Sequence, residues 1–293
     1  MKRTQRTVLS FLLMTLAFVS AIFIIYLWQE RFSGTDNKPI IICPSETISA
    51  SVESLIDKSM LLKDITAIDV EDGDITSSVV VESVSQFVEE GHCIITYAAF
   101  DSANNVTKLT RHLFLTDYVH PRFRITEPLE FNYSSTFSPL SVVGAYDCIE
   151  GDISDRVKMS FVNQEESITS VGAHMVEFRV TNSLGDVAVL QAEVDVFDRT
   201  YTETRMTPVV KLTDYIIYVD QYSYIDPSSY IKGVTLGGVL YDLSEYHNGS
   251  IVIDDVGVDV NTPGVYKILY TCDNRGDYYG SSVLIVIVSE VNN

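Results

Sequence analysis

One segment of about fifteen residues occurs three times in this chain, and its recurrence constrains the fold more than any other feature. The copies begin at Gly91, Gly172 and Gly264 and read GHCIITYAAFDSANN, GAHMVEFRVTNSLGD and GVYKILYTCDNRGD. In each copy an aromatic residue follows the glycine by six positions and a carboxylate or amide by ten. Apolar residues alternate with positions that admit charge, which is typical of a half-buried β-strand. Copies 81 and 92 residues apart are too distant for a solenoid, so each predicts one small all-β domain.

Prolines mark the start of each predicted domain, at Pro39, Pro121 and Pro208, and apolar residues follow each one. Proline suits the first residue of an edge strand because its missing N–H is not needed there. Apolar, β-branched strands close each segment, and no helical period is found between residues 38 and 290. The pattern therefore predicts three tandem β-sandwiches of about seven short strands each. Their ranges are 38–117, 118–199 and 200–293.

An uncharged, largely apolar block covers residues 8–28 and is long enough to cross a bilayer core of ~30 Å. A signal peptide is the alternative to an uncleaved anchor. The anchor is favoured because a secretory apolar region is usually only ~7 to 15 residues long. Lys2, Arg3 and Arg6 precede the block, so the positive-inside rule places residues 1–7 in the cytoplasm. Residues 29–37 then form a spacer, and the domains lie outside the cell membrane.

The charge of the exported part excludes some partners. All 40 acidic residues lie beyond residue 28, against 17 of the 20 basic ones, so this part carries a formal net charge of −23. Nucleic acid and anionic lipid are poor partners for such a surface. The five histidines are scattered without metal-ligand spacing, and no nucleophile stands out with a base. We therefore predict a protein that is not an enzyme and has no catalytic residues or organic cofactor.

An acidic turn in the first predicted domain is the one candidate for a bound ion. Four carboxylates fall within six residues, and the later turn could bring a fifth to the same end of the sandwich: Asp69, Glu71, Asp72, Asp74 and Asp101. Clustered carboxylates are costly without a cation, and Ca²⁺ takes six to eight oxygen ligands. However, Gly73 is typical of a simple turn, and the full twelve-residue calcium pattern is missing. A structural turn is favoured, with a weak calcium site as the alternative.

Two of the four cysteines, Cys43 and Cys93, fall in strands of the first predicted domain, and Cys93 points inward by its parity. A disulfide between them would close a loop of about 50 residues, worth ~4 kcal/mol in the chain-entropy model. Two unpaired thiols are equally ordinary in such a core, so both alternatives stay open. Cys148 and Cys272 lie in separate predicted domains and should be free.

Tyrosine is concentrated near the C-terminus, where 11 of the 17 lie between residues 208 and 290. Exposed tyrosines offer flat amphipathic area suited to sugars or protein partners. A recognition patch in the third predicted domain would use Tyr222, Tyr224, Tyr278 and Tyr279. Ordinary strand composition is the alternative and is favoured.

Three stretches of the first predicted domain carry a family resemblance: DVEDGDIT at residues 69–76, the strand at 91–97 and DSANN at 101–105. Together they resemble bacterial immunoglobulin-like surface repeats, a group also found in pesticidal crystal proteins and akin to hyalin repeats. The match is strongest over 38–117 and fair over 118–198 and 208–290. The resemblance implies Ig-like sandwiches used for spacing, adhesion or polymer contact at the cell surface, with no common ligand.

These features together predict a single-pass membrane protein that presents three tandem Ig-like domains outside a bacterial cell. Its predicted role is a non-enzymatic stalk or interaction module, in contact with the membrane through the N-terminal helix and with an envelope polymer or surface protein. A glycan- or polymer-binding protein that uses the tyrosine-rich domain is the first alternative. A subunit of a membrane complex, held by the span, is the second.

Overall fold

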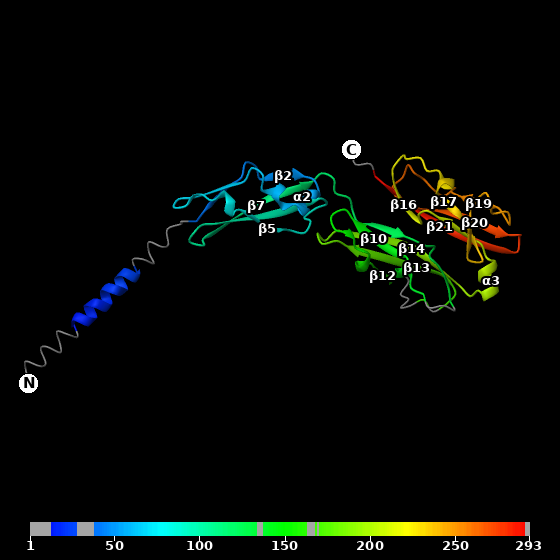
Figure 1. The fold of residues 1–293 in the computed structure, drawn as a ribbon, viewed down its shortest axis with the longest axis horizontal. Helices are drawn as coiled ribbons and strands as arrows, with labels where there is room; N and C mark the ends of the chain where they lie inside the picture. The colour runs from blue at the N-terminus through cyan, green and yellow to red at the C-terminus, as the bar shows by residue number, and fades with distance from the viewer. Residues whose placement is uncertain (1–12, 28–37, 134–136, 163–167, 169, 291–293) are drawn as a thin grey trace, which may run out of the picture. The chain divides into compact units, whose positions relative to one another are not determined.

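The computed structural model of this chain describes residues 13–27, 38–133, 137–162, 168 and 170–290 (Figure 1). Residues 13–27 are helical, and strands dominate from Ile40 onward. The predicted tail 1–7, the spacer 29–37 and both ends of the predicted span 8–28 lie outside the described residues. Among the residues described, no helix combines the length and apolar character needed to cross a membrane. The chain divides into two units, Met1–Thr116 and Asp117–Asn293.

The first unit contains two sheets, which we call sheet pair 1. The three-stranded sheet has the order β1 (Ile40–Ile42), β3 (Thr66–Asp69), β4 (Gly73–Asp74). The four-stranded sheet has the order β2 (Thr47–Ala50), β7 (Val106–Leu115), β6 (His92–Phe100), β5 (Val80–Val84). β2 runs parallel to β7, and the other neighbours are antiparallel. Short helical turns connect the strands: α2 (Glu53–Ile56), η1 (Lys58–Leu62) and η2 (Thr76–Ser78).

Strand β6 contains the first copy of the repeated segment, and its side chains alternate as predicted. Cys93, Ile95 and Tyr97 are fully buried, whereas the intervening Ile94 and Thr96 are partly exposed. The Tyr97 hydroxyl donates a hydrogen bond of 2.9 Å to the carbonyl of Leu61, so the one polar atom of this buried ring is satisfied. The predicted strand and its inward face are confirmed.

The second unit contains four sheets. Sheet pair 2 consists of two sheets. The three-stranded sheet has the order β11 (Gly151–Asp152), β10 (Val143–Asp147), β8 (Arg122–Ile125). The four-stranded sheet has the order β12 (Lys158–Phe161), β13 (Gly172–Thr181), β14 (Val187–Phe197), β9 (Glu130–Asn132). Sheet pair 3 also consists of two sheets. The three-stranded sheet has the order β15 (Val209–Leu212), β17 (Ile231–Leu236), β18 (Val239–Tyr241). The four-stranded sheet has the order β16 (Ile216–Asp220), β21 (Tyr278–Ser289), β20 (Gly264–Asn274), β19 (Ile251–Asp254). Three 3₁₀ turns complete the pairs: η3 (Pro139–Ser141), η4 (Ser154–Arg156) and η5 (Pro227–Tyr230). Each pair thus repeats the three-plus-four arrangement of pair 1.

A short helix, α3 (Tyr201–Met206), connects sheet pairs 2 and 3; like α2, it is too short to produce a helical period in the sequence. It begins with a capping box in which the Thr200 hydroxyl accepts from the Glu203 N–H and the Glu203 carboxylate accepts from the Thr200 N–H. This exchange satisfies two of the backbone groups that a helix end leaves free. The Thr-x-x-Glu pattern at residues 200–203 is the sequence signal for such a helix start, and it could have indicated this helix even though six residues are too few to show a hydrophobic period.

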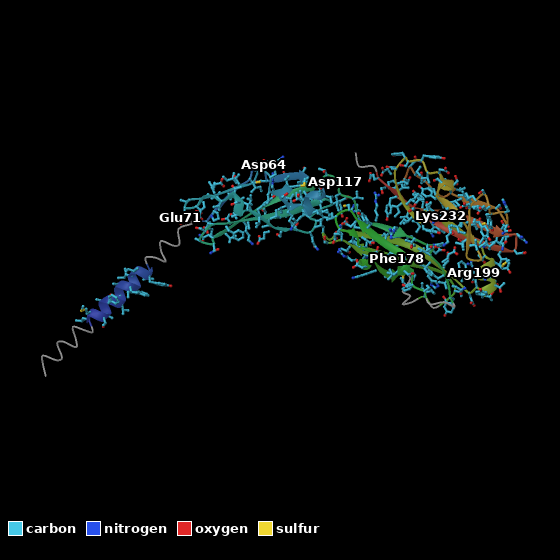
Figure 2. All side chains as sticks on the ribbon, in the orientation of Figure 1. Asp64, Glu71, Asp117, Phe178, Arg199 and Lys232 are labelled. Carbon is cyan, nitrogen blue, oxygen red and sulfur yellow. The ribbon has the colours of Figure 1, made fainter. Side chains whose placement is uncertain are left out.

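Sheet pairs 2 and 3 share one continuous hydrophobic core. Its members include Phe178 and Leu190 from pair 2, and Tyr270 and Leu284 from pair 3, all at most 1% exposed. Phe178 lies among the strands of pair 2 in the view with side chains (Figure 2). The predicted boundary near residue 200 therefore falls inside a single packed unit, and the division into three domains stays a prediction.

Polar contacts accompany the shared core. The Tyr218 hydroxyl on β16 accepts a 2.7 Å hydrogen bond from the backbone N–H of Phe123 on β8, and the Arg122 guanidinium lies 5.0 Å from the centre of the Tyr218 ring. Burial raises the pKa of Tyr218 to about 12, so the hydroxyl stays protonated at neutral pH. A tyrosine of pair 3 thereby fixes the position of the first strand of pair 2.

Replacing Phe178 with alanine should test how far pairs 2 and 3 depend on each other. A buried Phe→Ala change leaves a cavity and costs about 3–5 kcal/mol. Because the core is continuous, hydrogen exchange should accelerate in β20 and β21 of pair 3 as well as in β13 and β14, with β6 and β7 of the first unit unchanged. Val189→Ala on exposed β14 surface is the matched control. Acceleration confined to pair 2 would contradict a shared core.

Candidate functional site

The predicted acidic turn of sheet pair 1 connects β3 to β4, and its carboxylates are hydrogen-bond acceptors within the turn. Asp69 Oδ1 accepts from the N–H groups of Glu71 at 2.7 Å and Asp72 at 3.0 Å, while Asp74 Oδ1 accepts from the N–H of Thr76 at 2.9 Å. Gly73 has a φ of +71°, a conformation that glycine adopts without strain. The backbone donors of Asp72 and Glu71 lower the pKa of Asp69, and Thr76 lowers that of Asp74, so both are ionised at neutral pH.

The later turn, after β6, is fastened to this acidic turn through Asp72. The two oxygens of Asp72 accept from the N–H of Ser102 at 2.7 Å and from its hydroxyl at 2.8 Å. Asp101 in turn accepts from the N–H and the side-chain amide of Asn105, both at 2.7 Å. The structure therefore brings the Asp69 turn and Asp101 to one end of the sandwich, as predicted. Asp69 and Asp101 are buried there, whereas Glu71, Asp72 and Asp74 are exposed. Within the described residues, no three His, Cys, Asp or Glu side chains are grouped to hold a metal ion.

Sheet pair 2 repeats these hydrogen bonds between the two turns, with one difference. Asp147 Oδ1 accepts from the N–H groups of Ile149 at 2.9 Å and Glu150 at 3.0 Å, and Glu150 accepts from the N–H of Ser183 at 2.6 Å. The second oxygen of Asp147 accepts a 3.0 Å hydrogen bond from the side-chain amide of Asn182. Asn182 is the counterpart of Asp101, because each follows its repeat glycine by ten residues. An amide thus stands in pair 2 where pair 1 has a carboxylate.

The disulfide considered from the sequence is not formed. All four cysteines are free thiols, with Cys93 and Cys272 buried and Cys43 and Cys148 partly exposed. The Cys43 thiol follows β1 and donates to the carbonyl of Ser45 at 2.9 Å, whereas Cys93 lies on β6 in the opposite sheet. Burial raises the pKa of the Cys93 thiol to about 11, so it is an inert core residue. The alternative of two unpaired thiols holds.

The four tyrosines of the predicted recognition patch lie at two distant places. β16 pairs in parallel with β21, with Asp220 opposite Ser289, so Tyr222 and Tyr224 lie near the end of β21. Tyr278 and Tyr279 are at its start, and Tyr279 is ten residues before Ser289, roughly 33 Å away at 3.3 Å per residue. Tyr222, Tyr224 and Tyr279 are exposed by 69%, 90% and 67%, whereas Tyr278 is half-buried. Exposure agrees with a binding role, but a single patch of four is not formed.

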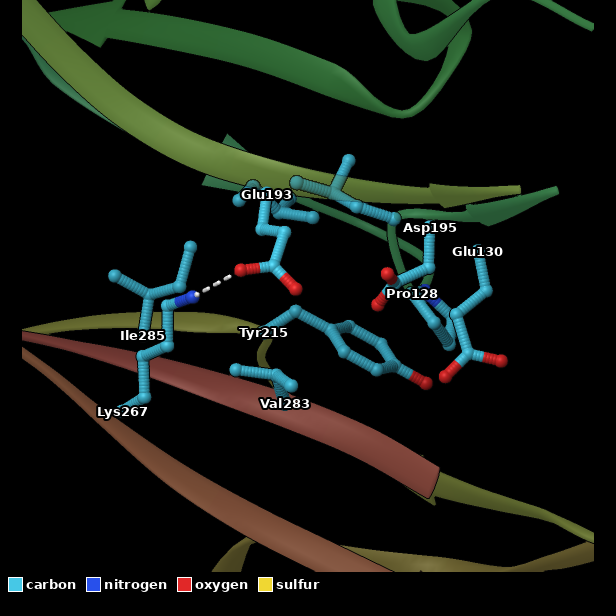
Figure 3. Close-up of a pocket in the computed structure, with 10 residues that line it drawn as sticks. Pro128, Glu130, Glu193, Asp195, Tyr215, Lys267, Val283 and Ile285 are labelled. Atoms are coloured by element: carbon cyan, nitrogen blue, oxygen red, sulfur yellow. Dashed lines mark hydrogen bonds and ion pairs between the residues drawn. The ribbon is translucent and has the colours of Figure 1, made fainter. Parts of the chain in front are cut away.

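A small cavity of about 50 Å³ lies between sheet pairs 2 and 3 (Figure 3). Three carboxylates of pair 2 line it, Glu130, Glu193 and Asp195, together with Lys267 and Tyr215 of pair 3. Figure 3 shows the ion pair across the cavity, in which the Lys267 Nζ lies 3.4 Å from a Glu193 oxygen. Burial raises the pKa of Glu130, and burial together with the Glu193 charge raises that of Asp195.

The sequence offered no signal for this cavity. Its carboxylates come from β9 and β14, and its lysine comes from β20, more than 70 residues further along the chain. Lys267 belongs to the third copy of the repeated segment, but nothing in that segment relates it to the carboxylates, and these side chains come together because pairs 2 and 3 pack against each other. The hydroxyl of Ser281 on β21 donates to Glu130 at 3.0 Å, which adds a further contact across the same junction.

No protein-family profile and no curated protein matches this chain. Similar solved structures include the CBM51-2 and INT domains of Clostridium perfringens ZmpB in complex with GlcNAc, at 18% identity, 54% of this chain, 41% of that chain and a TM-score of 0.22. Drosophila N-cadherin EC1-4 is 13% identical; the match covers 71% of this chain and 58% of that chain, with a TM-score of 0.21. Mouse cadherin-23 EC22-24 is 10% identical; the match covers 87% of this chain and 100% of that chain, with a TM-score of 0.20.

This chain thus spans 41% and 58% of the first two of these structures. At TM-scores near 0.2, the similarities assign neither a family nor a function to it.

Replacing Glu130 with glutamine should change how stability depends on pH. The folded-state pKa of Glu130 is raised, so its contribution to stability is full below the unfolded-state value of about 4.5 and is lost as pH rises through the folded-state value. Glutamine can still accept from Ser281 and has no charge to desolvate. The Tm of Glu130→Gln should therefore fall less than that of the wild type between pH 4.5 and 7.

Glu177→Gln is the matched control for this experiment. Glu177 is on β13, and its pKa is lowered by the Arg179 guanidinium, so its contribution to stability is present above the unfolded-state value and is lost as pH falls. The control should therefore flatten the acid side of the profile instead. Superimposable pH profiles for wild type and Glu130→Gln would contradict the assignment of a desolvated carboxylate at the junction.

Proposed function

We propose that this chain is a non-enzymatic, membrane-anchored cell-surface protein that acts as an Ig-like stalk or interaction module. The observation that carries the proposal is the continuous core of sheet pairs 2 and 3. Two sandwiches with one core and a buried Tyr218 contact cannot hinge freely, so the described strands between residues 117 and 290 behave as one stiff block. Stiffness is what a spacer or a presented binding surface requires, since a pre-ordered surface loses less entropy on binding.

The proposal includes three Ig-like domains, one for each sheet pair. Each pair has a three-stranded and a four-stranded sheet, and each contains one copy of the repeated strand in the middle of its four-stranded sheet, as β6, β13 and β20. Three-plus-four strands is also the composition of a constant-type immunoglobulin sandwich. This repetition supports counting pairs 2 and 3 as separate Ig-like domains that have fused their cores.

The proposal also includes an anchor at residues 8–28, with the N-terminus in the cytoplasm and the domains outside. The described helix at 13–27 is apolar, and its large side chains are exposed, from 46% at Leu27 to 74% at Met14. Exposed apolar side chains along a helix favour a lipid environment. The basic residues that precede it favour this orientation.

Protease accessibility tests the topology. Protease added to intact, wall-stripped cells should digest residues beyond 38 and leave a small fragment that contains the span, because only residues 1–7 are expected inside. A tag at the C-terminus should be lost in intact cells, and a tag at the N-terminus should be lost only after lysis. Protection of the C-terminal tag in intact cells would contradict the proposal.

Binding of a glycan or envelope polymer is the second candidate function, and the loop after β16 favours it. Tyr222 is 69% exposed and has a φ of +69°, a left-handed conformation that a bulky residue rarely adopts. Tyr224, two residues later, is 90% exposed. Strained residues cluster at ligand-binding positions, and exposed tyrosine rings stack on sugars.

Pull-down with purified cell-wall polymer tests this second function. The Tyr222→Ser/Tyr224→Ser variant should lose at least about tenfold in affinity, because truncating two aromatic contacts typically costs more than 1 kcal/mol each at a binding centre. Tyr279→Ser, at the other end of β21, is the matched control and should bind as the wild type does. Equal binding by all three proteins would exclude this loop as the site.

A further inference from the structure

One oxygen of Asp69 is buried without a hydrogen-bond partner. The Asp69 side chain is on the last residue of β3, the residue is 9% exposed, and its Oδ2 atom has no partner. In the described part of the chain, only two further buried side-chain atoms share this condition, and both belong to Arg111. A buried charged acceptor without a partner costs free energy of folding, so the position of this atom suggests that a ligand binds it.

Sheet pair 2 shows what the missing partner looks like. Asp147 there is held as Asp69 is, with Oδ1 accepting from the N–H groups two and three residues further on. The shared contacts leave Oδ2 as the oxygen of each carboxylate that is not bonded to its own turn. In pair 2 that oxygen receives the side-chain amide of Asn182 at 3.0 Å, and Asp147 is completely buried.

Asp101 occupies the position of Asn182 in pair 1 and cannot supply this donor. The later turns correspond closely, because Ser102 donates to Asp72 as Ser183 donates to Glu150. Asp101 is also 9% exposed, and both of its oxygens accept from Asn105. Carboxylate oxygens that already accept from Asn105 offer Asp69 no donor, so pair 1 has two carboxylates at the positions where pair 2 has an acceptor and a donor. Such a pair is stabilised by a cation.

We propose that a calcium-sized divalent cation binds between Asp69 Oδ2 and Asp101 in sheet pair 1, in place of the amide of Asn182 in sheet pair 2. Carboxylate oxygens suit a hard cation such as Ca²⁺, and water can complete its coordination. Two carboxylates without a third make a weak site, in the range of about 10⁻⁴–10⁻³ M that extracellular modules use. Of the residues suggested by the sequence, Asp72 and Asp74 instead hold the turns together. The site rests on the geometry of pair 1 and is independent of the proposed stalk role.

Hydrogen exchange of the full-length chain in detergent micelles tests the site, with CaCl₂ compared against EDTA and against MgCl₂. A ligand that binds only the folded turn raises its protection by a factor of 1 + [Ca²⁺]/Kd, about tenfold at ten times Kd. This rise should appear in residues 66–76 and 100–106. The corresponding segments of pair 2, residues 143–154 and 181–187, should not respond.

Reciprocal variants separate a cation site from a general effect of salt. Asp101→Asn reproduces the arrangement of pair 2, because its amide can donate to Asp69 Oδ2. This variant should be as protected in EDTA as the wild type is in calcium, and it should no longer respond to calcium. Asn182→Asp should weaken the turn of pair 2 in EDTA and make its protection depend on calcium.

Three outcomes would overturn the proposal. The first is a wild-type turn whose protection is the same in calcium and in EDTA. The second is an undiminished calcium response in Asp101→Asn. The third is a turn that is indifferent to calcium but gains protection between pH 7 and 5, which would show that the two carboxylates share a proton instead of a cation. Isothermal titration with CaCl₂ gives an independent measure, with one site expected in the wild type and none in Asp101→Asn.

Discussion

The aromatic residue at the centre of each repeated strand is the contact on which each sandwich depends. Tyr97, Phe178 and Tyr270 are all 0% exposed and lie midway along the long hairpins β6–β7, β13–β14 and β20–β21. Burying a ring of this size contributes more than any other single side chain of its strand. Both tyrosine hydroxyls donate to a carbonyl of a helical-turn residue, Leu61 or Pro227, at 2.9 and 2.8 Å. The same ring therefore joins the sheet to the connection that covers it.

The polar turn at the end of each hairpin shows that one backbone conformation can carry side chains of different charge and hydrogen-bonding capacity. The shared contacts from Asp69 and Asp147 to their own turns fix the backbone, and the residue ten positions after the glycine then decides what the second oxygen meets. In pair 3 that residue is Asn274, whose amide donates to the carbonyl of Met206 at 2.9 Å, and the acidic turn is absent. A single Asp/Asn difference thus removes the amide donor that the second oxygen has in pair 2, without changing the fold.

Much of this architecture was predictable because strand parity and turn chemistry are local. The inward positions of Cys93 and Phe178, the proline openings and the acidic turn followed from spacing along the chain. The fused core of pairs 2 and 3 and the cavity that contains Glu193 and Lys267 were not predictable, because they depend on contacts between residues more than 70 positions apart. The tyrosines misled for a related reason. They were grouped because they share one predicted domain, but the parallel pairing of β16 with β21 places Tyr222 and Tyr224 at the opposite end of β21 from Tyr278 and Tyr279.

The polar contacts between pairs 2 and 3 orient the two sandwiches more than they stabilise them. In a chain of net charge −20, Lys267 and Lys211 of pair 3 contact Glu193 and Glu127 of pair 2. The four side chains are between 27% and 52% exposed, so solvent screens each pair and its contribution is at most about 1 kcal/mol. Burial of apolar surface is not directional, and it would permit the sheets to slide. Lysines placed opposite carboxylates at two points of the junction admit one alignment, which explains how a strongly acidic protein can pack two sandwiches together without mutual repulsion.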